Sequence, residues 1–276
     1  MTPSSAHPIV PRRVQFAFEG VGRHWLAGRP GMTHQANALH VLFPPGEKWF
    51  VRIANKALPQ LTDPVLAAST RGFLGQEALH ARSHESFFET LRAQGFPVEE
   101  METVIDREIA RRERLLPYGM QLAVISGIEH YTAALGAWAF ERGVFDGAHP
   151  ALADLFLWHA SEEIEHKCVA FDLREALAPG YARRTLGLVF ATLGILVAWT
   201  ILGSVFVRTD PETTFRAALA DQWRAFWEGK TPFGTMARAF VRYLRPGFHP
   251  SQTDDLRLAE EYLARSPAVR ALGTRA

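Results

Sequence analysis

Apolar residues recur along most of the chain at the three- and four-residue intervals that are typical of amphipathic helices. Almost no segment alternates between apolar and polar residues with the period of two that indicates a strand. Clusters of proline and glycine, such as those at 95–97, 143–150 and 179–180, separate the helical segments. The pattern therefore predicts an all-α fold.

The predicted helices divide the chain into four parts. Residues 1–35 contain scattered proline and glycine and are expected to form an irregular arm. Residues 36–182 contain two similar helical hairpins, which should pack as a four-helix bundle with extra helices. Residues 183–208 are expected to form one long apolar helix, and residues 209–276 are expected to form amphipathic helices.

Helix start and stop signals bound the long helices of the bundle. The first should begin near 33–36 and end at Leu58, with a kink or a new start at the Phe-Pro-Pro-Gly sequence 43–46. The second should run without a break over 62–94, and a later one over 151–177.

The stretch 186–207 is uncharged and overwhelmingly apolar. About 20 apolar residues suffice to cross a bilayer, so this helix is long enough to span a membrane. The alternatives are a helix buried in the bundle or one covered by a partner subunit, as in a homodimer. Arg183 and Arg184 precede the stretch and Arg208 follows it, so flanking charge does not decide its orientation. We expect a protein in the cytoplasm or at the cytoplasmic face of the inner membrane, and associated with that membrane.

Composition excludes several functions. The formal net charge of the 276 residues is only +1, so nothing indicates binding to nucleic acid. The single cysteine, Cys168, excludes an intrachain disulfide framework and a cysteine-rich zinc or iron–sulfur site. Residues 1–8 lack the charged and apolar segments of a signal peptide.

Two Glu-x-x-His motifs occur in apolar helical segments, and each is preceded at a similar distance by a lone glutamate. Residues three apart on a helix project from the same face, so each motif offers a carboxylate and an imidazole together. An ionisable side chain on an apolar face is costly to bury unless it is paired or bound to a metal. In chain order, the six candidate metal ligands are Glu47, Glu77, His80, Glu129, Glu163 and His166.

Four glutamates and two histidines in this order form the ligand set of dinuclear sites in carboxylate-bridged four-helix bundles. The four carboxylates balance the charge of two divalent ions. Such a set suits iron or manganese better than structural zinc, whose sites are richer in thiolate or imidazole. We therefore expect two iron ions as the cofactor, with manganese and zinc as alternatives.

Three residues near the motifs are candidates for catalytic roles. His84 and His159 lie on the face of the motifs, one turn away, where each could be an extra ligand, an orienting group or a core histidine. Glu162 is a candidate general base, or an acceptor for the N–H of a ligand histidine.

The chain resembles a known family in the segments that carry the motifs. The segments GQEALHARSH and WHASEEIEHKCVAFD are similar to a bacterial family described as predicted metal-dependent hydrolases, and the motif set resembles the ferritin-like di-iron carboxylate superfamily. The resemblance covers about residues 35–182 and implies that the six residues above bind metal. A membrane-attached di-iron bundle is also similar to the alternative oxidases and the ubiquinone-pathway hydroxylases, which act on lipid-soluble substrates.

Two enzymatic functions fit this set of residues. The leading one is a di-iron oxidase or oxygenase that acts on a small apolar or lipid-like substrate near the membrane, with dioxygen and an electron donor as partners. The alternative is a metal-dependent hydrolase, in which a metal-bridging hydroxide attacks an ester, an amide or a phosphoester. Metal storage is disfavoured because the apolar stretch would spoil a soluble, shell-forming surface.

Overall fold

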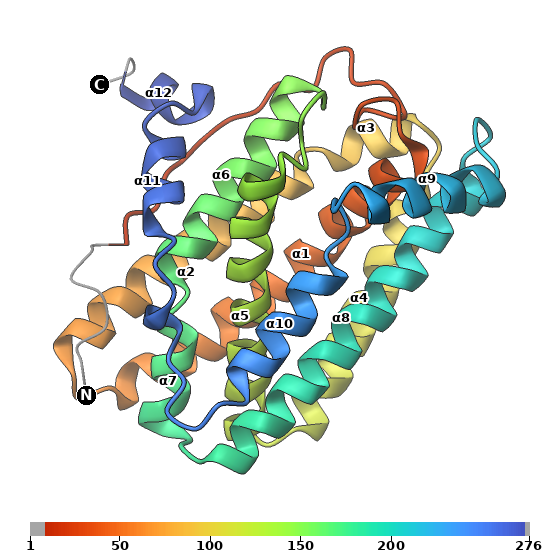
Figure 1. The fold of residues 1–276 in the computed structure, drawn as a ribbon. Helices are drawn as coiled ribbons and strands as arrows, with labels where there is room; N and C mark the ends of the chain where they lie inside the picture. The colour runs from red at the N-terminus through yellow and green to blue at the C-terminus, as the bar shows by residue number, and fades with distance from the viewer. Residues whose placement is uncertain (1–8, 274–276) are drawn as a thin grey trace.

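The computed structural model describes residues 9–273, and over that range the chain is all-α, which confirms the predicted class (Figure 1). The predicted leader, residues 1–8, lies outside the described residues. The helices are α1 (Pro30–Ala57), the short 3₁₀ helix η1 (Leu58–Gln60), α2 (Pro64–Glu85), α3 (Phe88–Ala93), α4 (Val98–Leu115), α5 (Tyr118–Arg142), α6 (Pro150–His166), α7 (Val169–Leu177), α8 (Tyr181–Thr209), α9 (Phe215–Trp227), α10 (Phe233–Tyr243), the 3₁₀ helix η2 (Pro250–Gln252), α11 (Leu256–Leu263) and α12 (Pro267–Gly273).

Helices α1, α2, α5 and α6 form the part of the bundle that holds the motifs. Helix α1 packs along α2, α5 packs along α6, and α2 also contacts α6. Local signals start these helices where the sequence places them. Asp63 accepts hydrogen bonds from the backbone N–H groups of Val65 and Leu66 at the start of α2, and Pro150 is the first residue of α6.

Helix α1 is longer and less interrupted than the sequence indicates. It begins at Pro30, before the predicted start, and continues through Pro44 and Pro45 to Ala57. The two prolines remove the backbone donors that would otherwise reach the carbonyls one turn earlier. The helix nevertheless continues, because residues on both sides of the prolines, such as Val41 and Trp49, are held in the core. Glu47 therefore lies within a helix and not at its start.

The two helices that carry the Glu-x-x-His motifs end earlier than predicted. The predicted helix 62–94 is divided into α2 and α3 by a turn after Glu85, where the Ser86 hydroxyl donates a hydrogen bond to the carbonyl of Ser83. The predicted helix 151–177 is divided into α6 and α7 directly after His166. Each motif therefore lies near the C-terminal end of its helix.

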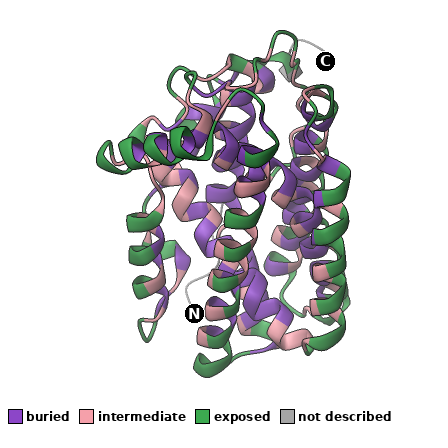
Figure 2. Ribbon diagram, turned by 90° about the vertical axis from the view of Figure 1, so that its right-hand side faces the viewer, coloured by how far each residue is buried: buried purple, intermediate pink, exposed green. Residues whose placement is uncertain are grey.

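The apolar stretch forms most of α8, which packs on α5 and α1. A Cβ atom added at Gly187 would lie 2.5 Å from the backbone of Ala123 on α5, so the glycine allows the two helices to approach closely. By length and composition α8 could cross a membrane, but one of its faces belongs to the protein core. The opposite face is exposed on the side of the molecule that Figure 2 shows.

The described part of the arm, residues 9–29, runs along the outside of the helices before entering α1 (Figure 1). It contains no helix or strand, and it is shorter than the predicted arm of residues 1–35 because α1 begins at Pro30. An isolated antiparallel bridge pairs Leu26 with Ala148 in the loop before α6. The arm thus adds contacts to α2 and α6 from outside the bundle.

The helices after α8 pack back on the bundle. Helix α9 contacts α1, α10 contacts α5, and α11 contacts α6. The hydroxyl of Tyr262 on α11 donates a hydrogen bond of 2.8 Å to Asp154 on α6. These contacts hold the C-terminal helices against α1, α5 and α6.

Candidate metal centre

The six candidate ligands come from four helices and meet in the interior of the bundle. None of them is more than 4% exposed. Helix α1 supplies one glutamate, α5 supplies another, and α2 and α6 each supply a glutamate and a histidine: Glu47, Glu129, Glu77 with His80, and Glu163 with His166. Their role as ligands stays a prediction.

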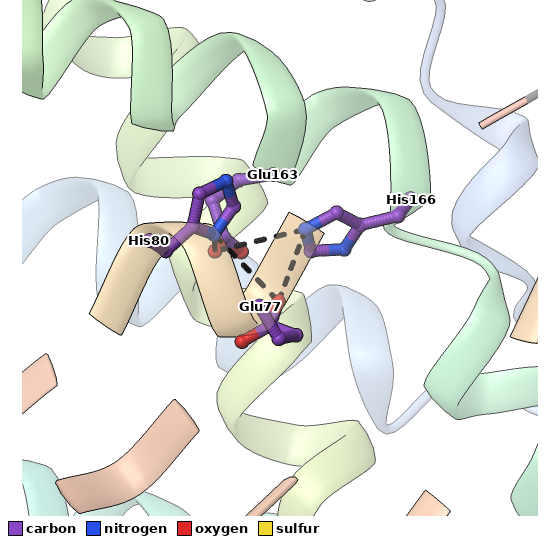
Figure 3. Close-up of side chains that lie close together, drawn as sticks. All are labelled: Glu77, His80, Glu163 and His166. Atoms are coloured by element: carbon purple, nitrogen blue, oxygen red, sulfur yellow. Dashed lines mark ion pairs between the residues drawn. The ribbon is translucent and has the colours of Figure 1, made fainter. Parts of the chain in front are cut away.

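The two Glu-x-x-His motifs face each other across the bundle (Figure 3). One side-chain atom from each of the four residues lies within 4.8 Å of the others. His166 Nε2 is 3.2 Å from Glu77 Oε1, and His80 Nδ1 is 3.7 Å from Glu163 Oε1. Glu129 Oε2 lies 3.1 Å from the other ring nitrogen of His166. These separations leave the donor atoms close enough to share a metal ion.

A second group of donor atoms adjoins the first. Glu47, His84 and His159 also bring one atom each within 4.8 Å of the others. His159 Nε2 lies 3.5 Å from Glu47 Oε1 and 2.8 Å from Glu163 Oε1, so Glu163 borders both groups. A carboxylate in this position is suited to bridge two ions.

Most donor atoms of the site have no hydrogen-bond partner. Even His166 Nε2 and Glu77 Oε1, which lie 3.2 Å apart, form no hydrogen bond. Buried polar atoms are almost always paired in proteins, so these atoms fit cations as their partners. The buried atoms without a partner include both oxygens of Glu47, Glu77 and Glu129, one oxygen of Glu163, Nδ1 of His80 and both ring nitrogens of His166.

The electrostatics of the metal-free site also favour a cation. Burial raises the pKa of Glu47 and Glu77 well above the ordinary value, and repulsion from neighbouring carboxylates raises both further. Burial alone would lower the pKa of His166, but Glu163 and Glu129 raise it well above its ordinary value. Without metal the ionised forms of Glu47, Glu77 and Glu129 are therefore disfavoured, whereas two divalent ions would balance the charge of all four glutamates.

Glu162 lies behind His80 and not in the space between the ligands. Its carboxylate accepts hydrogen bonds from His80 Nε2 at 3.0 Å and from the indole N–H of Trp158 at 3.2 Å. These bonds hold the imidazole so that Nδ1 points toward Glu77 and Glu163. A carboxylate that orients a ligand histidine in this way increases its basicity and fixes its position. The general-base role of Glu162 stays a prediction.

Arg12 of the arm belongs to the site, although no motif in the sequence points to it. Its guanidinium is 2.8 Å from Glu162 and forms a two-bond contact with Glu165 at 2.7 and 2.8 Å. Gln76 on α2 donates a third hydrogen bond to Glu165 at 2.9 Å. Arg12 thus compensates two buried carboxylates at once, and it links the arm to α6.

His84 and His159 belong to a chain of three hydrogen-bonded imidazoles. His159 contacts Glu163 on one side and His84 on the other, where the two ring nitrogens are 2.7 Å apart. His84 in turn contacts His40 on α1, also at 2.7 Å. Sequence reasoning missed His40, although it precedes Glu47 by two helical turns and so lies on the same face.

A third cluster lies at the far end of α8, away from the ligands. Asp210 Oδ2 accepts hydrogen bonds from the Nε2 atoms of His24 and His34, each at 2.7 Å. The backbone N–H of Glu212 donates to the other oxygen at 2.9 Å. Because hydrogen bonds satisfy Asp210, this cluster is best described as a polar contact between the arm, α1 and the end of α8.

No curated protein and no solved structure matched this chain. The family model described as predicted metal-dependent hydrolase matches residues 10–254, which includes the arm with Arg12, all six candidate ligands and α8. The match extends well beyond the segments that carry the two motifs. The chain therefore belongs to the family of predicted metal-dependent hydrolases.

Proposed function

We propose that the protein is a hydrolase with a dinuclear metal centre bound by Glu47, Glu77, His80, Glu129, Glu163 and His166. The observation that carries the proposal is the set of buried carboxylate oxygens without hydrogen-bond partners, contributed by all four central helices. The family supports hydrolysis as the reaction. Two divalent ions at this site would lower the pKa of a water molecule and polarise the bond to be cleaved in an ester, amide or phosphoester.

The surrounding residues have separate tasks in this proposal. Glu162 and Arg12 hold His80 in a fixed orientation through the contacts described above. The hydrogen-bonded chain of His159, His84 and His40 holds the His159 imidazole against Glu163. The chain ends in the core, because His40 is fully buried and its Nε2 atom has no partner, so these three histidines serve as positioning groups.

A di-iron oxidase or oxygenase is the second candidate, because its metal would suit the same donor atoms. The donors are four carboxylates and two imidazoles, which suits iron, and aromatic rings surround them. The rings of Phe73 and Trp158 lie 4.9 and 5.0 Å from those of His166 and His80. A small apolar substrate, dioxygen and an electron donor would be its partners.

Metal content measured beside hydrolytic activity tests the proposal. The wild type should contain about two metal ions per chain, and Glu77→Ala/Glu163→Ala should lose them. The exposed pair Glu89→Ala/Glu260→Ala is the matched control and should retain them. Turnover of chromogenic esters and phosphodiesters without oxygen, restored to the stripped enzyme by zinc or manganese, supports the hydrolase.

The same experiment separates the two candidates. Iron in the purified protein, with turnover only when oxygen and a reductant are present, would replace the hydrolase with the oxidase. A wild type that binds no metal under any condition would contradict both.

A further inference from the structure

Helix α9 buries small side chains and exposes large apolar ones, which is the reverse of the usual arrangement. Its buried residues are the small Ala218 and Ala225 together with Asp221. Its large apolar residues point outward and are between 49% and 71% exposed: Phe215, Leu219, Trp223, Phe226 and Trp227. Burial of such side chains is strongly favourable, so a helix that exposes all of them is suited to be covered by something else.

Helix α8, which leads into α9, also exposes a row of apolar residues. Its outward residues recur every three or four positions and are between 44% and 57% exposed: Leu186, Phe190, Leu193, Val197 and Ile201. Helix α9 follows α8 after the short connection 210–214 and contacts it. We call these ten residues the α8–α9 apolar surface. It faces outward on the side of the molecule shown in Figure 2.

The packing of α8 argues against a membrane crossing. Gly194 lies near the middle of the apolar stretch, and a Cβ atom added there would lie 2.7 Å from the guanidinium of Arg112 on α4. Arg112 is itself paired with Glu108 at 3.0 Å. A crossing would place this charged pair at the centre of the hydrocarbon, where charges are rare and costly. The bundle can instead lie with α8 parallel to a membrane surface.

The chemistry around α9 matches a lipid surface. An open groove of about 550 Å³ runs beside α9, and its walls include Leu219, Trp223, Phe226 and Phe233, with Arg216 among them. Aromatic side chains next to arginine are typical of segments that lie at the boundary between lipid headgroups and acyl chains.

The charge of this region complements anionic lipids. Its acidic residues are paired with cationic or imidazole groups of the protein itself: Asp221 and Glu228 with Arg29, Glu212 with Arg23, and Asp210 with two histidines. The basic side chains of the segment that includes α9 and α10 are more numerous and mostly exposed: Arg208, Arg216, Arg224, Lys230, Arg238, Arg242 and Arg245. A surplus of positive charge beside an exposed apolar surface favours a membrane over a second copy of the same basic surface.

We propose that the α8–α9 apolar surface binds the surface of a lipid bilayer that contains anionic lipids, with α8 lying in the interface and not crossing it. The basic residues of α9 and α10 contact headgroups, and the outward residues of α9 enter the acyl region. This attachment does not depend on the reaction that the metal centre catalyses.

Co-flotation of the full-length protein with vesicles tests the proposal. The protein should bind vesicles of phosphatidylcholine and phosphatidylglycerol in equal amounts more tightly than phosphatidylcholine alone, and added salt should weaken the binding. Trp223→Ser/Trp227→Ser should lower the partition coefficient by about a hundredfold, since each large aromatic contributes about a factor of ten. Alkaline carbonate should release the bound protein.

Val10→Ser/Val65→Ser is the matched control, because both valines are about half exposed and lie outside the proposed surface. It should bind as the wild type does. Circular dichroism of each variant checks that its helices are intact. The proposal is overturned if the wild type floats with neither kind of vesicle, or if carbonate fails to release it. It is also overturned if the tryptophan variant loses only self-association in the analytical ultracentrifuge, which would assign the surface to a second copy.

Discussion

Neutralising one buried carboxylate of the candidate metal centre should stabilise the metal-free protein and weaken its response to metal. Glu129→Gln keeps the size of the side chain and removes its charge. Burial and the charge of Glu163 raise the pKa of Glu129 from 4.5 to about 7, although His166 partly opposes the rise. That rise corresponds to about 3 kcal/mol of unfavourable free energy once the carboxylate is ionised in the folded state.

The sign of this effect depends on pH. As the pH rises from 4.5, the unfolded state releases the Glu129 proton first, and the folded state retains it until about pH 7. The metal-free wild type therefore loses stability across this window. Glu129→Gln avoids the loss, so at pH 8 its melting temperature should exceed that of the wild type by about 5 °C. At pH 4.5 the two proteins should be nearly equal.

Bound metal should reverse the order of the two melting temperatures. Two divalent ions need the charge of Glu129, so iron(II) or manganese(II) should raise the melting temperature of the wild type more than that of Glu129→Gln. Scanning fluorimetry in chelator and in excess metal measures both effects, and Glu89→Gln on exposed α3 is the control. A variant less stable than the wild type in chelator at pH 8, or equally stabilised by metal, would refute the reasoning.

Three further predictions concern the residues that hold the site and the bundle together. Arg12→Met leaves Glu162 buried without its cation, so urea unfolding should show a loss of about 3 kcal/mol and metal titration an affinity about tenfold lower. Gly187→Val places side-chain atoms against the backbone of α5 and should cost about 2 kcal/mol or more in the same unfolding assay. Burial lowers the pKa of His34, with Asp210 partly opposing, so the unfolded state takes up a proton first as the pH falls below about 6.5 and stability declines. When the pH is lowered from 6.5 to 5, the melting temperature of His34→Asn should fall less than that of the wild type.

The sequence predicts the all-α class and the face of each motif because both depend on local spacing. Glu77 and His80 must share a face on any helix, and the same holds for Glu163 and His166. The structure then brings these four residues within a few ångströms of one another. Spacing alone indicated these four candidate ligands, since a helix makes neighbours of positions three apart, whereas Glu47 and Glu129 were indicated by their positions ahead of the two motifs.

Features that depend on contacts between residues far apart in the chain could not be predicted from the sequence. Arg12 lies in an irregular arm, and only the folded chain shows that it reaches Glu162 and Glu165. The length and composition of α8 are compatible with a membrane span. The close approach of Arg112 to Gly194, which argues against a span, is a tertiary contact and cannot be predicted from the hydropathy of α8. Hydropathy measures what a helix could bury and says nothing about the neighbours that a fold gives it.

The long reach of Arg12 has a consequence for the order of events during folding. The arm leaves the ribosome early, whereas its carboxylate partners are synthesised some 150 residues later. The candidate ligands are likewise spread from Glu47 to His166, so no short segment can assemble the site by itself. Contacts at such separations in sequence form slowly, because the entropy of closing a long loop is lost before any contact compensates for it. Metal should therefore enter a bundle that has already formed, and the docking of the arm should be among the last steps to stabilise it.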